Sequence, residues 1–165
     1  MKQHIPILLI LFFLTSFSFG QSVDTINLRK KAFKNYFVCI KSHEEKKLKK
    51  YKKYVHPAIL KQVGEEKLLL ENDLNIKITE RNISEIGKIY FDNQVYQFTF
   101  TETTISDNEN REKVSSYTVI AMSYNKGKNW VFFNAYDSIE KMKEDIPELS
   151  SNLKIKNIPK LNFQF

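Results

Sequence analysis

The chain has 165 residues and carries 26 lysines and arginines against 19 acidic residues, so its net charge is +7. This length suits one domain with a real hydrophobic core, and a lone cysteine, Cys39, excludes an internal disulfide framework. The sequence contains no nucleotide-binding motif, no nucleophile constellation and no set of metal ligands, so we predict no catalytic residue, no cofactor and no metal site.

The N-terminus has the pattern of a secretory signal peptide. Lys2 precedes an apolar run that begins at Ile5, and small residues stand at Ser18 and Gly20. A retained membrane anchor is the alternative, but an apolar run of about 15 residues is shorter than the roughly 20 that a spanning helix needs. We therefore predict cleavage before Gln21, export to the periplasm or the exterior, and no membrane span in the mature chain.

The first third of the mature chain is predicted to be helical. Apolar residues from Asp24 to about Lys41 recur at steps of three and four, which predicts a long amphipathic helix capped by Asp24 or Thr25. Its apolar stripe is expected to comprise Ile26, Phe33, Tyr36, Phe37 and Ile40. A proline disfavours the α conformation of the residue before it, so His56 is expected to be a turn residue that ends a second helix. The expected helices span residues 24–41, 44–54, 57–63 and 65–74.

Six of the eight residues from 46 to 53 are lysine: Lys46, Lys47, Lys49, Lys50, Lys52 and Lys53. Two interpretations are open. The run is a solvated helix face, partly offset by Glu44 and Glu45, or it is a patch for an anionic partner such as an acidic glycan or lipid headgroups. Export argues against nucleic acid as that partner.

The back half is predicted to be strand-rich. The second expected strand alternates: Tyr96, Phe98 and Phe100 occupy one side, which should face the helices, and glutamine and threonines occupy the other, which should face water. Residues 106–113 are expected to form a polar hairpin tip. The expected strands span residues 84–91, 94–104, 114–124 and 129–136.

The last two strands should form a hairpin closed by Asn-Lys-Gly, with Gly127 in the left-handed region. A three-residue loop of this kind sets Met122 opposite Trp130 and Ile120 opposite Phe132. Both faces of the hairpin are then apolar, so both must be covered.

Helices would cover one face of this hairpin. The other would be covered either by a second subunit or by the extended tail at residues 150–165, whose apolar residues are spaced by polar ones. A short helix is expected from Ser138 to Asp145, capped by Ser138 and stopped before Pro147.

This order of elements ends in a strand with the sequence GKNWVFF, and it resembles the nuclear transport factor 2-like superfamily, a cone-shaped α+β fold that includes the SnoaL-like cyclases and the ketosteroid isomerases. More narrowly, the chain is similar to small exported bacterial proteins with a YVHPAIL helix and a late IPEL stretch, here Ile146–Leu149. The resemblance covers about Asp24 to Leu149. Together with the signal peptide pattern, the predicted organisation is a signal peptide at 1–20, an α+β domain of this kind at 21–149 and an extended tail at 150–165. In such a domain the N-terminal helices pack into the concave side of a curved, mainly antiparallel sheet of about four strands.

The resemblance also implies a pocket at the wide mouth of the cone and, in many members, pairing through the outer face of the sheet. Enzymes of the superfamily hold an aspartate base and a hydrogen-bond donor inside the cone, but no residue here matches those motifs. Glu85 or Asp92 could be the carboxylate of such an enzyme only if its side chain points into the cone. Buried core tyrosines are the simpler alternative to a pocket. The candidate pocket residues are Tyr36, Tyr96, Phe98 and Tyr117.

We therefore expect an exported, non-catalytic domain that binds a small apolar or amphipathic ligand or a protein partner, with a homodimer through the outer face of the sheet as one such pairing. Two alternatives stay open. One is an isomerase- or dehydratase-like enzyme that uses a carboxylate in the cone, and the other is a module that binds anionic glycan or lipid through residues 46–53.

Overall fold

A computed structural model describes residues 24–64, 77–108 and 111–158. The predicted signal peptide, the helix expected over 65–74 and the end of the tail at 159–165 lie outside the described residues. Within these ranges, no helix is both long and apolar enough to cross a membrane.

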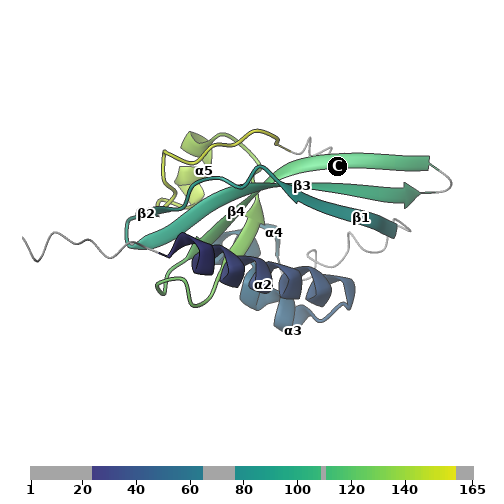
Figure 1. Ribbon diagram of the computed structural model, residues 1–165, viewed down its shortest axis with the longest axis horizontal. Coiled ribbons are helices and arrows are strands. Elements are labelled where there is room, and N and C mark those ends of the chain that lie inside the picture. Colours follow the sequence, from purple (N-terminus) through teal and green to yellow (C-terminus); the bar gives the residue numbers. More distant parts are fainter. Residues whose placement is uncertain (1–23, 65–76, 109–110, 159–165) are drawn as a thin grey trace, which may run out of the picture.

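The predicted α+β class is confirmed: N-terminal helices pack against one mainly antiparallel sheet, which has five strands rather than the expected four. Figure 1 shows α2 on one side of the sheet and α5, with the chain that follows it, on the other. The helices are α2 (Thr25–Glu44), α3 (Leu48–Tyr51), the 3-10 helix η1 (Lys52–Tyr54), α4 (Pro57–Val63) and α5 (Ile139–Asp145). The strands are β1 (Lys77–Ser84), β2 (Tyr90–Asp92), β3 (Val95–Asn108), β4 (Arg111–Ser123) and β5 (Val131–Asn134).

Helix α2 begins where its cap predicts. The Asp24 carboxylate accepts a hydrogen bond from the backbone N–H of Asn27 at 3.0 Å, which satisfies one of the donors left free in the first turn. The buried stripe comprises Ala32, Tyr36, Cys39 and Ser42. Two apolar residues that we expected on this stripe are instead exposed, Ile26 by 65% and Phe37 by 57%.

The second predicted helix is broken. Lys46 has a positive φ of 53°, which a continuous α-helix does not allow, so the chain turns there before α3 begins. Helix α4 has the predicted bounds. His56, expected to be a turn residue, is buried and caps α4 by accepting a hydrogen bond at Nδ1 from the N–H of Ala58 at 3.2 Å.

Strand β3 is the centre of the sheet. It pairs with β4 along its whole length on one side and with β2 and then β1 on the other. The prediction of one strand over 84–91 is therefore wrong. β1 ends where that strand was expected to begin, and β2 starts near its expected end. In the connection between them, the N–H of Gly87 donates to the carbonyl of Thr99 at 2.8 Å. A Cβ on Gly87 would lie 2.9 Å from Thr99 Oγ1, so a side chain there would clash.

Strands β3 and β4 are longer than predicted. They stay paired out to Asn108 and Arg111, so most of the expected polar tip is strand. This part of the two strands could not be predicted from alternating apolar residues, because both of its faces are mostly polar.

The predicted register of the last hairpin is wrong by one residue. Met122 lies opposite Val131 and Ile120 opposite Phe133, and seven residues rather than the expected three connect β4 to β5. Side chains hold this wider turn: the N–H of Gly127 donates to Ser123 Oγ at 3.0 Å. Gly127 is in the left-handed region as predicted, with φ 76°.

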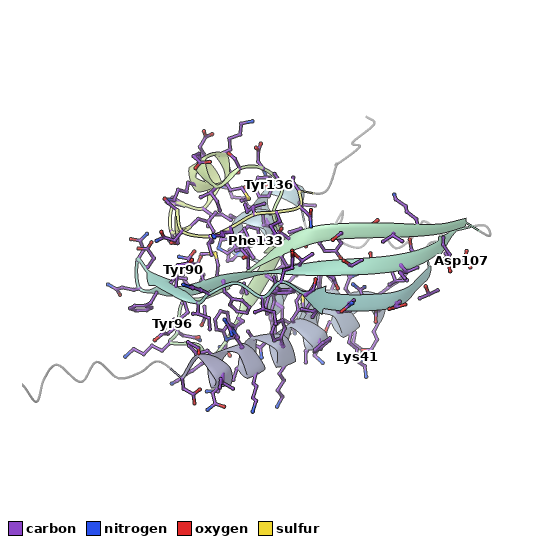
Figure 2. The ribbon with its side chains drawn as sticks, turned by 45° about the horizontal axis from the view of Figure 1, so that its top comes forward. Lys41, Tyr90, Tyr96, Asp107, Phe133 and Tyr136 are labelled. Carbon is purple, nitrogen blue, oxygen red and sulfur yellow. The ribbon has the colours of Figure 1, made fainter. Side chains whose placement is uncertain are left out.

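Both faces of this hairpin are covered, as predicted, and by the same chain. One core packs beneath α2 and the other beneath α5 and residues 146–153. Figure 2 shows Phe133 and Tyr136 on the α5 side of the sheet and Lys41 on the α2 side. The second apolar face therefore needs no second subunit, and a homodimer through the sheet stays a prediction.

The polar side of β3 does not face water, contrary to the prediction. Gln97, Thr99 and Thr101 are buried. Gln97 Nε2 donates to the carbonyl of Glu148 at 2.7 Å, and its Oε1 accepts from the N–H of Ser150 at 3.0 Å. The side-chain amide thus ties the chain after α5 to the centre of the sheet.

Candidate functional site

A buried carboxylate joins four elements on the α2 side of the sheet. Glu102 on β3 is only 1% exposed. Its Oε1 accepts a hydrogen bond from Arg81 on β1 at 2.8 Å, and its Oε2 accepts from the hydroxyl of Tyr36 on α2 at 2.7 Å and from the hydroxyl of Tyr117 on β4. We call these four residues the Glu102 cluster.

Strand geometry explains how the cluster assembles. Glu102 follows Phe100 by two residues on β3, so it lies on the same face as the aromatic core. Tyr117 is its direct cross-strand neighbour on β4. Arg81 also forms an ion pair with Glu44 at 3.3 Å, so its guanidinium links the end of α2 to the interior.

Electrostatics keep the hydroxyls and the nearby thiol protonated. Burial, and then the negative charge of Glu102, raise the pKa of Tyr36 well above its ordinary value, and the same two causes raise that of Tyr117. Burial, with a smaller contribution from Glu102, raises the pKa of Cys39 to about 12. Cys39 is therefore a buried core thiol rather than a thiolate nucleophile.

The Glu102 cluster is built to hold elements together. A buried carboxylate is costly unless it is paired and hydrogen-bonded. Here both oxygens accept hydrogen bonds from the same chain, which offsets the cost of burying the charge.

The four predicted pocket residues belong to one core beneath α2 but contact different neighbours within it. Tyr36 and Tyr117 meet at Glu102, whereas Phe98 packs edge-to-face on Trp130, with ring centroids 5.4 Å apart. Tyr96 lies at the start of β3 and packs against Phe91, with the two rings tilted by 41°.

The two carboxylates considered for the enzyme alternative lie elsewhere. Glu85 accepts from Thr101 at 2.9 Å and pairs with Lys156 at 2.8 Å, on the face of β3 opposite Glu102. Asp92 ends β2, where it pairs with Val95. Neither belongs to the Glu102 cluster.

Sequence reasoning missed Glu102 and Arg81. The alternation of side chains along a strand could have identified Glu102, because a residue two positions after Phe100 lies on the same, aromatic side of the strand. Arg81 gave no such signal, since β1 itself is too polar to be recognised as a strand.

The second candidate site is the run of lysines that begins in the turn before α3 and continues through α3 and η1. An open depression of about 520 Å³ is lined there by Lys47, Leu48, Lys49, Lys50 and Lys53. Lys46 and Lys52 belong to the same segment, so the six predicted lysines lie together. We call these six residues the lysine surface.

The lysine surface is only partly neutralised. Glu45 pairs with Lys47 at 2.9 Å and with Lys41 at 3.9 Å, and the hydrogen bond from Lys47 lowers the pKa of Glu45, so this carboxylate stays charged. In the described parts of the chain, no carboxylate forms an ion pair with Lys49 or Lys53. Among the residues that the structure describes, positive charge is therefore in excess around the depression.

Across residues 24–64, 77–108 and 111–158, no three histidine, cysteine or acidic side chains are placed to hold a metal ion. No protein-family model, curated protein or solved structure matches the chain. The resemblance to the nuclear transport factor 2-like superfamily thus stays a prediction.

Proposed function

We propose that this protein is a non-catalytic binding domain whose lysine surface takes an anionic partner, either an acidic glycan or lipid headgroups. The observation that supports this most is the open depression itself, which four lysines line around Leu48. Several cations around one concave surface raise the local concentration of an anion more than the same charges scattered over the molecule.

The alternatives have less support. An enzyme would need a carboxylate free to accept a proton, and the oxygens of Glu102 are occupied by Arg81, Tyr36 and Tyr117. A small apolar ligand would need space near Tyr36 and Phe98, whose rings pack on neighbouring rings. Both remain proposals of lower rank.

The test replaces the four lysines that line the depression, Lys47, Lys49, Lys50 and Lys53, with glutamine in one variant. The matched control replaces four exposed lysines on other surfaces, Lys61, Lys88, Lys128 and Lys154, so both variants lose the same charge. Binding of each full chain to a sulfated polysaccharide and to anionic vesicles is measured at low and at physiological salt.

We expect the first variant to bind at least about ten-fold more weakly than the wild type, because each lysine near an anionic surface contributes up to about 1 kcal/mol before screening. The control variant should lose much less binding affinity. Equal losses in both variants would show that only net charge matters, and absence of wild-type binding at physiological salt would refute the proposal.

A further inference from the structure

The outward face of α2 mixes lysines with an exposed aromatic side chain. Lys30, Lys34, Phe37 and Lys41 follow one another at steps of four, three and four, so they form one stripe along the helix. All four side chains are exposed. Ile26, four residues before Lys30, extends the stripe and is also exposed.

This stripe points away from the protein interior. The opposite side of α2 carries Ala32, Tyr36 and Cys39, which are buried against the sheet. Figure 2 shows Lys41 on the side of α2 away from the strands. Of the five lysines and arginines of α2, Arg29 donates to the carbonyl of Gly87 and the four lysines are exposed. The helix has a single acidic residue, Glu44, in its last turn, so its exposed side is positive.

The stripe is continuous with the lysine surface. Glu45 lies between them and pairs with Lys41 from α2 and with Lys47 from the lysine surface. Helix α3 packs against α2 on the same side of the sheet (Figure 1). The two groups of lysines can therefore face the same partner.

Phe37 decides which anionic partner fits. A sulfated glycan offers negative charge but no apolar phase for an exposed phenyl ring. A bilayer that contains anionic lipid offers both, and basic helices with an exposed phenylalanine bind in this way, with the ring below the headgroups and the lysines among them.

We infer that α2 and the lysine surface dock onto an anionic lipid bilayer, with Phe37 inserted between lysines. This inference rests on the proposed function, because it names the partner of the same surface. A sulfated glycan is the competing partner, and the experiment below separates the two.

The test compares Phe37→Ser with Phe91→Ser in the full chain. Phe91 is the matched control, since it is 60% exposed but lies on β2. We measure binding to mixed phosphatidylcholine–phosphatidylglycerol vesicles, to pure phosphatidylcholine vesicles and to a sulfated polysaccharide. Every sample carries the same apolar N-terminal segment, so differences between variants come from the substitutions.

Phe37→Ser should weaken binding to the anionic vesicles about five-fold, as expected for losing the transfer of a half-exposed phenyl ring from water. It should leave polysaccharide binding unchanged, and Phe91→Ser should change neither. Lys34→Gln with Lys41→Gln should also weaken binding to the anionic vesicles, because the stripe loses two charges.

A second readout does not depend on what else anchors the chain. The emission of Phe37→Trp should shift to the blue on anionic vesicles and be quenched by brominated lipid, whereas that of Phe91→Trp should not. Trp130 is fully buried and gives a constant background.

The outcomes are distinct. If the lysine surface binds polysaccharide while Phe37→Ser has no effect on vesicles and Phe37→Trp shows no shift, the lipid inference is overturned and the proposed function stands. If the wild type binds neither partner at physiological salt, both fail.

Discussion

Replacing Glu102 with alanine should destabilise the fold more than any exposed acidic substitution. The change removes the acceptor of three hydrogen bonds and leaves the Arg81 guanidinium and the hydroxyls of Tyr36 and Tyr117 without it. Removing one partner of a buried ion pair typically costs about 3 to 5 kcal/mol, because the remaining charge stays desolvated.

That cost is a large share of the roughly 5 to 15 kcal/mol by which domains are stable. It corresponds to a fall in Tm of about 10 °C for a chain of this size. Glu102→Gln should cost less, about 1 to 3 kcal/mol, since the amide oxygen still accepts from one donor.

Urea unfolding followed by the fluorescence of Trp130 measures these changes, because this sole tryptophan is fully buried in the same core. Glu80→Ala is the matched control: Glu80 is exposed on β1, next in sequence to Arg81. If Glu102→Ala shifts the unfolding midpoint no more than Glu80→Ala does, the Glu102 cluster does not hold the elements together and the reasoning is refuted.

Three further predictions concern other parts of the chain. Burial lowers the pKa of His56, so the folded state keeps the ring neutral while the unfolded chain takes up a proton below about pH 6.5. The free energy of unfolding should therefore fall as the pH drops through this value. His56→Asn, which retains an oxygen that can cap α4, should reduce the fall in the urea midpoint. Gly127→Ala should destabilise by about 1 to 3 kcal/mol, because a Cβ there would lie 2.1 Å from Leu28 Cδ2. Gly64→Ala, at a similar φ but with nothing within 4 Å of the added Cβ, should cost less when thermal unfolding of the two variants is compared. Intact mass spectrometry of the protein from its own host should show a chain that starts at Gln21, and a mass that includes residues 1–20 would contradict the signal peptide.

Local chemistry made most helices predictable. The caps at Asp24 and Ser138, and the break before Pro57, each depend on hydrogen bonds or sterics within four residues. The sequence therefore predicted α4 without error and placed the starts of α2 and α5 correctly.

Long-range pairing was harder to predict. The register of the last hairpin depends on side chains that hold its turn, such as Ser123, and β1 depends on the far half of β3 for its partner. Neither interaction leaves a periodic pattern. The Glu102 cluster could not be predicted for the same reason, because Arg81 contacts Glu102 only when β1 pairs with β3.

The two sides of α2 show another feature that the sequence pattern did not resolve. Counting apolar residues at three- and four-residue steps placed Phe37 and Tyr36 on one face, although neighbours in sequence lie about 100° apart around a helix. Only packing against the sheet shows that Tyr36 is buried and Phe37 exposed. Ile26 and Phe37, which are exposed, were therefore predicted to belong to the buried stripe.

The most direct measurement of the proposed surface is hydrogen–deuterium exchange of the full chain with and without anionic vesicles. We expect added protection to concentrate over residues 30–53, which span the outward face of α2 and the lysine surface. Protection confined to β3 and β4, or no change over residues 30–53 while the protein is bound, would contradict it.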